Sequence, residues 1–86
     1  MNLSEIGEAV ERLGFRCWCG EPITAEHVRS YDHRGGITVD GFAEKQWVHF
    51  RCPGCGYGWA LWKILNRKGL LVARGSELKA LEEASP

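Results

Sequence analysis

Four cysteines in two close pairs are the feature that most constrains this chain. Cys17 and Cys19 are separated by one residue, and Cys52 and Cys55 by two, in a chain of 86 residues. A chain this short buries little apolar surface, and such domains usually need a metal, disulfides or a partner. Two distant pairs of thiolates suit a tetrahedral structural zinc ion, because each tight turn presents two sulfurs to one point. The sequence therefore predicts one Zn²⁺ per chain, held by these four cysteines.

The second cysteine pair is stronger evidence for a metal site than the first. The run CPGCG over 52–56 has the composition of a zinc knuckle, since its glycines accept a left-handed backbone. The first pair is one residue short of the usual Cys-x-x-Cys, so its sulfurs project from a tighter turn. A mixed site in which His27, His33 or His49 replaces one cysteine is an alternative, as are disulfides, free thiols or an iron ion. Four thiolates leave no open coordination position for water, so we expect no enzyme.

Charge and hydropathy limit the compartment and the partners. Acidic residues at Glu5, Glu8 and Glu11 interrupt the apolar stretch that a secretory signal would need. No apolar run is long enough to span a bilayer, so we expect a cytoplasmic protein without a membrane partner. The eleven basic and eleven acidic residues cancel, and any grip on phosphate would have to come from local clusters of cations.

Hydrophobic periodicity predicts a helix at each end of the chain. The first helix is expected over 2–13, with Asn2 and Glu5 as a capping box and Gly14 after its end. The second is expected over 76–84, with Leu78 and Leu81 facing inward. Both helices are amphipathic, so each needs a surface on which to bury its apolar side.

The middle of the chain has the pattern of strands. They are expected over 24–31, 37–42 and 45–51, with a turn at Asp40-Gly41. In the last of these, Trp47, His49 and Arg51 share one face. Residues 57–65 are largely apolar, and we favour a strand there because short apolar runs flanked by glycine are more often strands. A helix is the alternative, since Arg67, Lys68 and Gly69 would end it well.

The segment over 17–65 resembles a zinc ribbon. The run WVHFRCPGCGYGW over 47–59 looks like the end of the ribbons in transcription elongation factor S and small RNA polymerase subunits. It is also similar to small Cys-Pro-x-Cys-Gly zinc-finger proteins of prokaryotes and their viruses. The resemblance covers a little over half of the chain and implies a three-stranded antiparallel sheet with the metal at one end. Gly35-Gly36 and Asp40-Gly41 stand where the elongation factor has an acidic pair, so transcript cleavage is not implied.

These observations predict one small metal-stapled α+β domain over 1–86. Its parts are a helix over 1–14, a zinc ribbon over 15–65, and a turn with a C-terminal helix over 66–86. If both helices lie on one face of the sheet, the other face exposes aromatic rings beside cations, as single-strand binders do. The candidate binding residues are Arg29, Arg34, Lys45, Trp47, Arg51, Lys63, Arg67 and Lys68.

The function expected from this surface is that of a nucleic-acid-associated or transcription-related binding module. Its partner would be a nucleic acid or a protein of the transcription machinery. The alternative is a protein-protein interaction adapter or a homodimer with no direct nucleic-acid binding, because exposed tryptophan and arginine also serve protein recognition.

Overall fold

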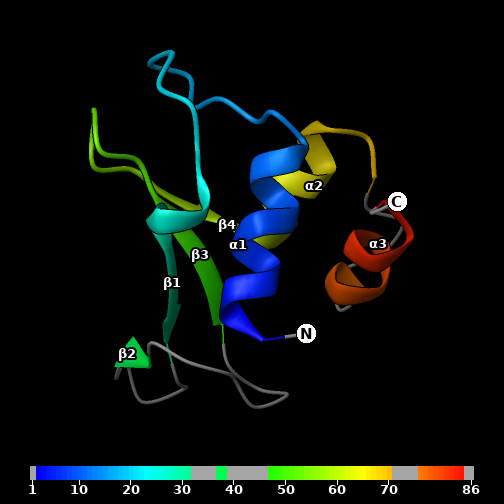
Figure 1. Cartoon of the computed structure of the whole chain (residues 1–86). Coiled ribbons are helices and arrows are strands. Elements are labelled where there is room, and N and C mark those ends of the chain that lie inside the picture. The colour runs from blue at the N-terminus through cyan, green and yellow to red at the C-terminus, as the bar shows by residue number, and fades with distance from the viewer. Residues whose placement is uncertain (1, 32–36, 39–46, 71–75, 85–86) are drawn as a thin grey trace.

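A computed structural model of the chain places an antiparallel sheet on one side and three helices on the other (Figure 1). The structure describes residues 2–31, 37–38, 47–70 and 76–84. The helices are α1 (Leu3–Arg12), α2 (Leu61–Arg67) and α3 (Glu77–Ala84), and a short 3₁₀ turn, η1, covers Ala25–His27. The strands are β1 (Val28–Tyr31), β2 (Ile37–Thr38), β3 (Trp47–Arg51) and β4 (Gly58–Ala60), in the order β2-β1-β3-β4. The small α+β fold with an antiparallel sheet is confirmed, but the sheet has four strands where the resemblance implied three, and α2 is an additional helix.

Helix α1 begins and ends at the predicted signals. The Asn2 side chain accepts the Glu5 N–H at 2.8 Å, and the Glu5 carboxylate accepts the Asn2 N–H at 3.3 Å. This capping box satisfies two backbone donors that have no partner within the helix. Ile6 and Val10 are fully buried, so the apolar side of the helix faces the core. Gly14 follows the helix with a φ of +69°.

The core lies between the sheet and the helices. Phe50 on β3 pairs with Val28 on β1 and with Trp59 on β4, and all three side chains lie in or against the core. Helix α1 contacts β1, α2 contacts β3 and β4, and α3 contacts both other helices. Leu81 of α3 is fully buried, as the periodicity predicted. One face of the sheet is therefore committed to packing.

The prediction of a strand over 57–65 is wrong for its second half. Strand β4 ends at Ala60, and α2 begins at the next residue. Leu61, Ile64 and Leu65 are buried, which is the i, i+3, i+4 spacing of a helix that packs on one side. A continuing strand would have placed Ile64 on the opposite face from Leu61 and Leu65. The helical alternative, with its end before Gly69, is correct for this segment.

The strand predicted over 24–31 is shorter than expected. Ala25–His27 form η1, and Thr24 precedes it. The Thr24 N–H donates to Nδ1 of His27 at 3.1 Å, and β1 starts only at Val28. Residues 39–42 and 45–46 and the predicted Asp40-Gly41 turn lie outside the described residues. None of the described helices is long and apolar enough to cross a membrane.

Candidate functional site

The four cysteine sulfurs meet at one end of the sheet. All four Sγ atoms lie within 4.8 Å of one another, with Cys17 and Cys55 at 3.6 Å and Cys19 and Cys52 at 3.4 Å. Sulfurs at the usual Zn–S distance of about 2.3 Å from a tetrahedral zinc would be separated by about 3.8 Å. The cluster is therefore of the right size and chemistry to hold one metal ion. It brings together the four residues that the sequence predicted as ligands.

The first knuckle, residues 17–20, is a tight turn closed by backbone hydrogen bonds. The Gly20 N–H donates to the Cys17 carbonyl, and the Cys17 N–H donates to the Glu21 carbonyl, both at 2.9 Å. An antiparallel bridge between Arg16 and Pro22 continues the pairing outward. Gly20 has a φ of +95°, a conformation that residues with a Cβ rarely adopt. The single residue between the two cysteines is thus sufficient for both sulfurs to reach the cluster.

The second knuckle, residues 52–56, repeats this arrangement with one residue more. The Gly56 N–H donates to the Cys52 carbonyl, and the Cys52 N–H donates to the Tyr57 carbonyl, both at 2.9 Å. Gly56 has a φ of +76° and closes the turn as Gly20 does. In both knuckles, a backbone hydrogen bond joins the residues before and after a turn that ends in a glycine.

Gly54 marks the place where the two knuckles touch. A Cβ at this position would lie 2.6 Å from Cγ of Glu21 and 3.3 Å from Sγ of Cys19. The first of these distances is shorter than any ordinary contact, so a side chain at 54 would force either the exposed Glu21 side chain or the knuckles to move. Glycine at 54 therefore allows the approach that brings the sulfurs together.

Burial divides the four sulfurs into an inner and an outer pair. Cys17 and Cys52 are 3% and 1% exposed, whereas Cys19 and Cys55 are exposed. Each knuckle contributes one of each kind, and each short contact joins an inner to an outer sulfur. An ion in the cluster would be covered by the core on one side and open to solvent on the other.

The environment shifts the pKa values of the thiols in opposite directions. Burial raises the pKa of Cys17, but the N–H of Cys19 and neighbouring side chains outweigh it and lower the pKa to about 6. The N–H of Glu21 lowers the pKa of Cys19, but the Cys52 thiol and burial raise it to about 12. A backbone N–H likewise lowers the pKa of Cys55, and burial with the adjacent thiols raises it by more. Adjacent thiolates repel one another, and a divalent cation among them would remove that penalty.

Trp59 joins the aromatic core to the cysteine cluster. Its indole Nε1 is buried and has no hydrogen-bond partner among the described residues. The N–H nevertheless lies close enough to Cys17 to lower the pKa of that thiol. The contact is a polar approach without hydrogen-bond geometry, and it places a donor beside an inner sulfur.

The alternatives to four cysteine ligands find little support in the geometry. Among the described residues, the group of potential ligands contains cysteines alone. His27 is engaged at η1, and His49 lies on β3, away from the cluster. His33 lies outside the described residues. The four thiols are free of disulfides, and their shortest separation of 3.4 Å is well above the roughly 2.05 Å of an S–S bond.

The face of the sheet away from the helices carries cations and an exposed tryptophan. Trp47, His49 and Arg51 alternate with the core residues of β3, and Arg29 on β1 pairs with His49. Trp47 is 76% exposed, and Arg29 and Arg51 are both exposed. We call these four residues the open face. Burial, then Arg51 and Arg29, lowers the pKa of His49, so both cations lie near its ring.

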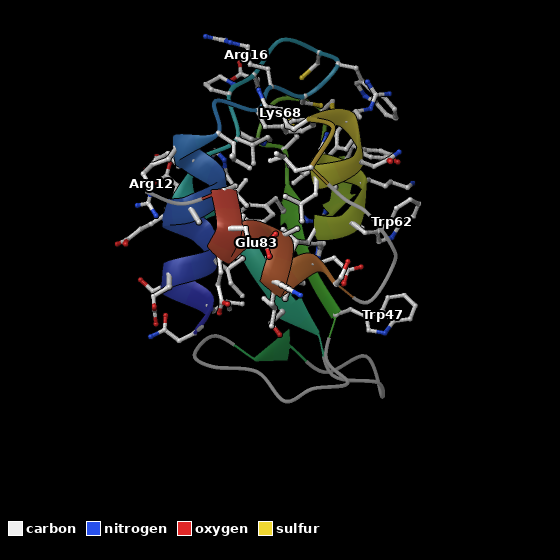
Figure 2. All side chains as sticks on the ribbon, turned by 90° about the vertical axis from the view of Figure 1, so that its right-hand side faces the viewer. Arg12, Arg16, Trp47, Trp62, Lys68 and Glu83 are labelled. Carbon is white, nitrogen blue, oxygen red and sulfur yellow. The ribbon has the colours of Figure 1, made fainter. Side chains whose placement is uncertain are left out.

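Helix α2 carries the second group of candidate binding residues. Lys63, Arg67 and Lys68 lie on the helix or at its end, and Figure 2 shows Lys68 at the same end of the molecule as Arg16 and the sulfurs. Lys63 donates a hydrogen bond to the Tyr57 hydroxyl at 3.0 Å, so its ammonium lies toward the edge of that ring. Arg34 and Lys45, the remaining candidates, lie outside the described residues.

Trp18 is a surface residue that the sequence analysis did not select as a binding candidate. It stands between Cys17 and Cys19 and is 60% exposed. The signal in the sequence was its position inside a predicted metal knuckle, which keeps a side chain from entering the core. In Figure 2, Trp47 and Trp62 project from one side of the molecule, and Trp62 is half-buried.

Comparison of the chain with known proteins gives no assignment: no protein family matches it, and no curated protein or solved structure matches it significantly.

Proposed function

We propose that this chain is a zinc-stabilised module of the zinc-ribbon type whose open face binds single-stranded nucleic acid. A set of four thiolates suits zinc, with iron as the other common ion for such a site. Zinc would be held by Cys17, Cys19, Cys52 and Cys55, and its chemistry there is structural, because four sulfurs complete its coordination. The bound ion would fix both knuckles and the end of the sheet next to them.

The composition of the open face is the observation that carries the binding proposal. All three described helices lie on the other side of the sheet, and no acidic residue occurs in the described strands. Arg29 and Arg51 supply charge for phosphates, and the exposed ring of Trp47 supplies a surface on which a base can stack. Bases in a duplex already stack on one another, so an exposed stacking residue favours a single strand.

His49 gives the proposed surface a dependence on pH. Burial, then Arg51 and Arg29, lowers its pKa from 6.5, so the ring is neutral at pH 7. A polyanion on the open face would favour the protonated ring and raise this pKa. Affinity should therefore increase as the pH falls below 6.5, and His49→Asn should remove most of this increase while the fold is retained.

Salt dependence of oligonucleotide binding tests the proposal directly. The zinc-loaded chain should bind a labelled single strand, with an affinity that falls steeply as salt increases. The double variant Arg29→Gln/Arg51→Gln should reduce the slope of log affinity against log salt by about 0.7 for each phosphate that is no longer neutralised. Arg12→Gln is the matched control, because this exposed arginine lies on α1, on the helical side. No retention of the single strand at low salt would rule the function out.

A second candidate function is protein recognition by the exposed tryptophans of the open face and of the first knuckle. The observation that favours it is the size of the exposed rings of Trp18 and Trp47 beside arginine, which are the residue types of interface hot spots. Binding to a protein partner would depend much less on salt than binding to a strand of phosphates. The salt titration therefore separates the two functions.

Metal analysis tests the zinc part of the proposal by itself. Purified protein should contain about one zinc per chain, and iron in its place would give the visible absorption of an iron-sulfur chromophore. Folded protein without any metal would exclude a structural ion.

A further inference from the structure

Trp18 stands out because it is fixed on one side and exposed on the other. Its ring centre lies 4.3 Å from that of Tyr57 and 5.0 Å from that of Trp59. The guanidinium of Arg67 lies 5.9 Å from the Trp18 ring centre and 5.0 Å from the Trp59 ring centre. These contacts hold the inner side of the ring, yet 60% of the residue stays exposed. The outer side of a large, immobilised aromatic ring thus faces solvent.

Core packing explains the buried aromatic rings next to Trp18, but it does not explain why Trp18 itself is a large exposed ring. Phe15 and Trp59 meet edge to face at 4.9 Å and are 5% and 1% exposed, so they are core residues. Trp18 lies against Tyr57 and Trp59, but most of its own surface remains exposed. Pre-organised aromatic rings of this kind lose little conformational entropy when a ligand stacks on them.

One cation, Arg67, lies against Trp18, and further charged residues lie at the same end of the molecule, among them the acidic Glu21 beside the first knuckle. Arg67 and Lys68 are at the end of α2, and Arg16 and Lys68 lie at the end of the molecule that carries the sulfurs (Figure 2). Four thiolates with a divalent ion keep a net negative charge, which nearby cations partly compensate. Arg67, however, is placed against the rings of Trp18 and Trp59, where it can also meet a ligand that stacks on Trp18.

The open face leads toward this end of the molecule. Strand β3 runs from Trp47 to Arg51, and the next residue is the ligand Cys52. A strand of nucleic acid that follows β3 from Trp47 past Arg51 therefore arrives at the knuckles, and from there it passes round the end of the sheet to reach Trp18, which packs on Trp59 and Arg67 on the helical side. Trp18 lies within the first knuckle, between two ligands.

We propose that Trp18 and Arg67 form a second contact for the single strand, in which Trp18 stacks on a base and Arg67 binds the adjoining phosphate. This inference rests on the proposed function. Since both neighbours of Trp18 in the chain are ligands, the position of its ring depends on the metal. The contact would therefore form only in the metal-loaded protein.

Variants of Trp18 and Arg67 in the full zinc-loaded chain test this contact. Trp18→Ala should weaken binding of a labelled single strand on the order of tenfold, because stacking on one base has about that effect. The salt slope should stay unchanged, since no charge is removed. Trp18→Phe should keep most of the affinity. Arg67→Gln should instead lower the slope by about 0.7. Arg12→Gln again serves as the charge control.

The outcomes separate this inference from the proposed function. If Trp18→Ala binds as tightly as the parent while Arg29→Gln/Arg51→Gln binds weakly, the second contact does not exist and the open face stands. If the parent binds no single strand, both proposals are wrong. If Trp18→Ala also unfolds or loses its zinc, ultraviolet cross-linking of the parent protein to the single-stranded nucleic acid tests the contact instead. A cross-linked peptide containing Trp18 supports the contact, and its absence overturns it.

Discussion

The two knuckles reach the same geometry from different sequences. The first has one residue between its cysteines, and the second has two, yet each supplies one buried and one exposed sulfur. Each is closed by a glycine with positive φ, Gly20 or Gly56, and each is flanked by a strand-like hydrogen bond. The position of a sulfur is thus set by the backbone bonds around the turn more than by the number of residues inside it.

What differs between the knuckles is the residue that the turn presents to its surroundings. The first presents Trp18, which is exposed and lies against Tyr57 with its ring tilted. The second presents Pro53 and Gly54, and Gly54 is in contact with the other knuckle. One turn therefore presents a side chain to solvent, and the other leaves space for the two knuckles to approach each other.

Metal removal should have the largest effect and should not distinguish the knuckles. A chelator is expected to unfold both together, because the binding energy of structural zinc, roughly 10–16 kcal/mol, is largely folding energy in such domains. Circular dichroism and amide NMR signals of each knuckle would follow the unfolding. Persistence of the signals of residues 15–23 after the second knuckle has unfolded would break the equivalence, since it would show a first knuckle held by its own pairing.

Single cysteine substitutions should separate the inner from the outer sulfurs. Each of the four changes to serine removes a ligand, but a serine at Cys17 or Cys52 also buries a hydroxyl. We expect these two to cost about 1–3 kcal/mol more than serine at Cys19 or Cys55, which is the cost of an unsatisfied buried polar group. Denaturant unfolding at fixed free zinc measures the difference. If both cysteines of one knuckle lost more stability on substitution than both cysteines of the other, the distinction between inner and outer sulfurs would be wrong.

Gly54→Ala should act through the contact between the knuckles. Its Cβ would lie 2.6 Å from Cγ of Glu21, and overpacking of this kind costs about 1–3 kcal/mol. Glu21→Ala in the same chain should recover part of the stability, and a double-mutant cycle measures the coupling. Additive effects of the two changes would show that the knuckles tolerate separation at this point.

The closing glycines give the smallest and most symmetrical effect. Gly20→Ala and Gly56→Ala should each cost about 1–2 kcal/mol, because alanine is strained at the φ values of +95° and +76°. Asparagine, which enters this region more readily, should cost less at both positions. Thermal unfolding of the four variants checks the result. A cost at one glycine alone would mean that the turns are closed by different means.

Sequence analysis predicted the parts that local signals determine. The capping box of Asn2 and Glu5 fixes the start of α1, and the alternation over Trp47–Arg51 correctly placed Trp47, His49 and Arg51 on one face. The cysteine cluster follows from the spacing and from the small size of the chain. Neighbours in the sequence determine the helix start and the strand faces, and the two cysteine pairs, although far apart in the sequence, are each identified by their local spacing.

The parts that were missed depend on contacts between distant segments. Residues 58–65 change from the period of a strand to that of a helix at Leu61, with neither a proline nor a glycine at the junction of Ala60 and Leu61. Trp59 enters the core from strand β4. Ile64 and Leu65 enter the same core from helix α2, which contacts β3, β4 and α3. The exposure of Trp18 likewise depends on Tyr57 and Arg67, which are far from it in the sequence.

The arrangement of the sheet and helices also distributes the charges of this neutral chain unevenly: the described helices carry charges of both signs, whereas the described strands carry arginines and no acidic residue. The acidic residues of α1 and α3 lie on the helical side, while Arg29 and Arg51 lie on the open face. At physiological ionic strength the electric field of a charge decays within about 8 Å, so a molecule at one surface scarcely feels the opposite one. An isoelectric point of about 6.8 is consequently an average over two unlike surfaces, and a polyanion that approaches the arginines meets a positive potential.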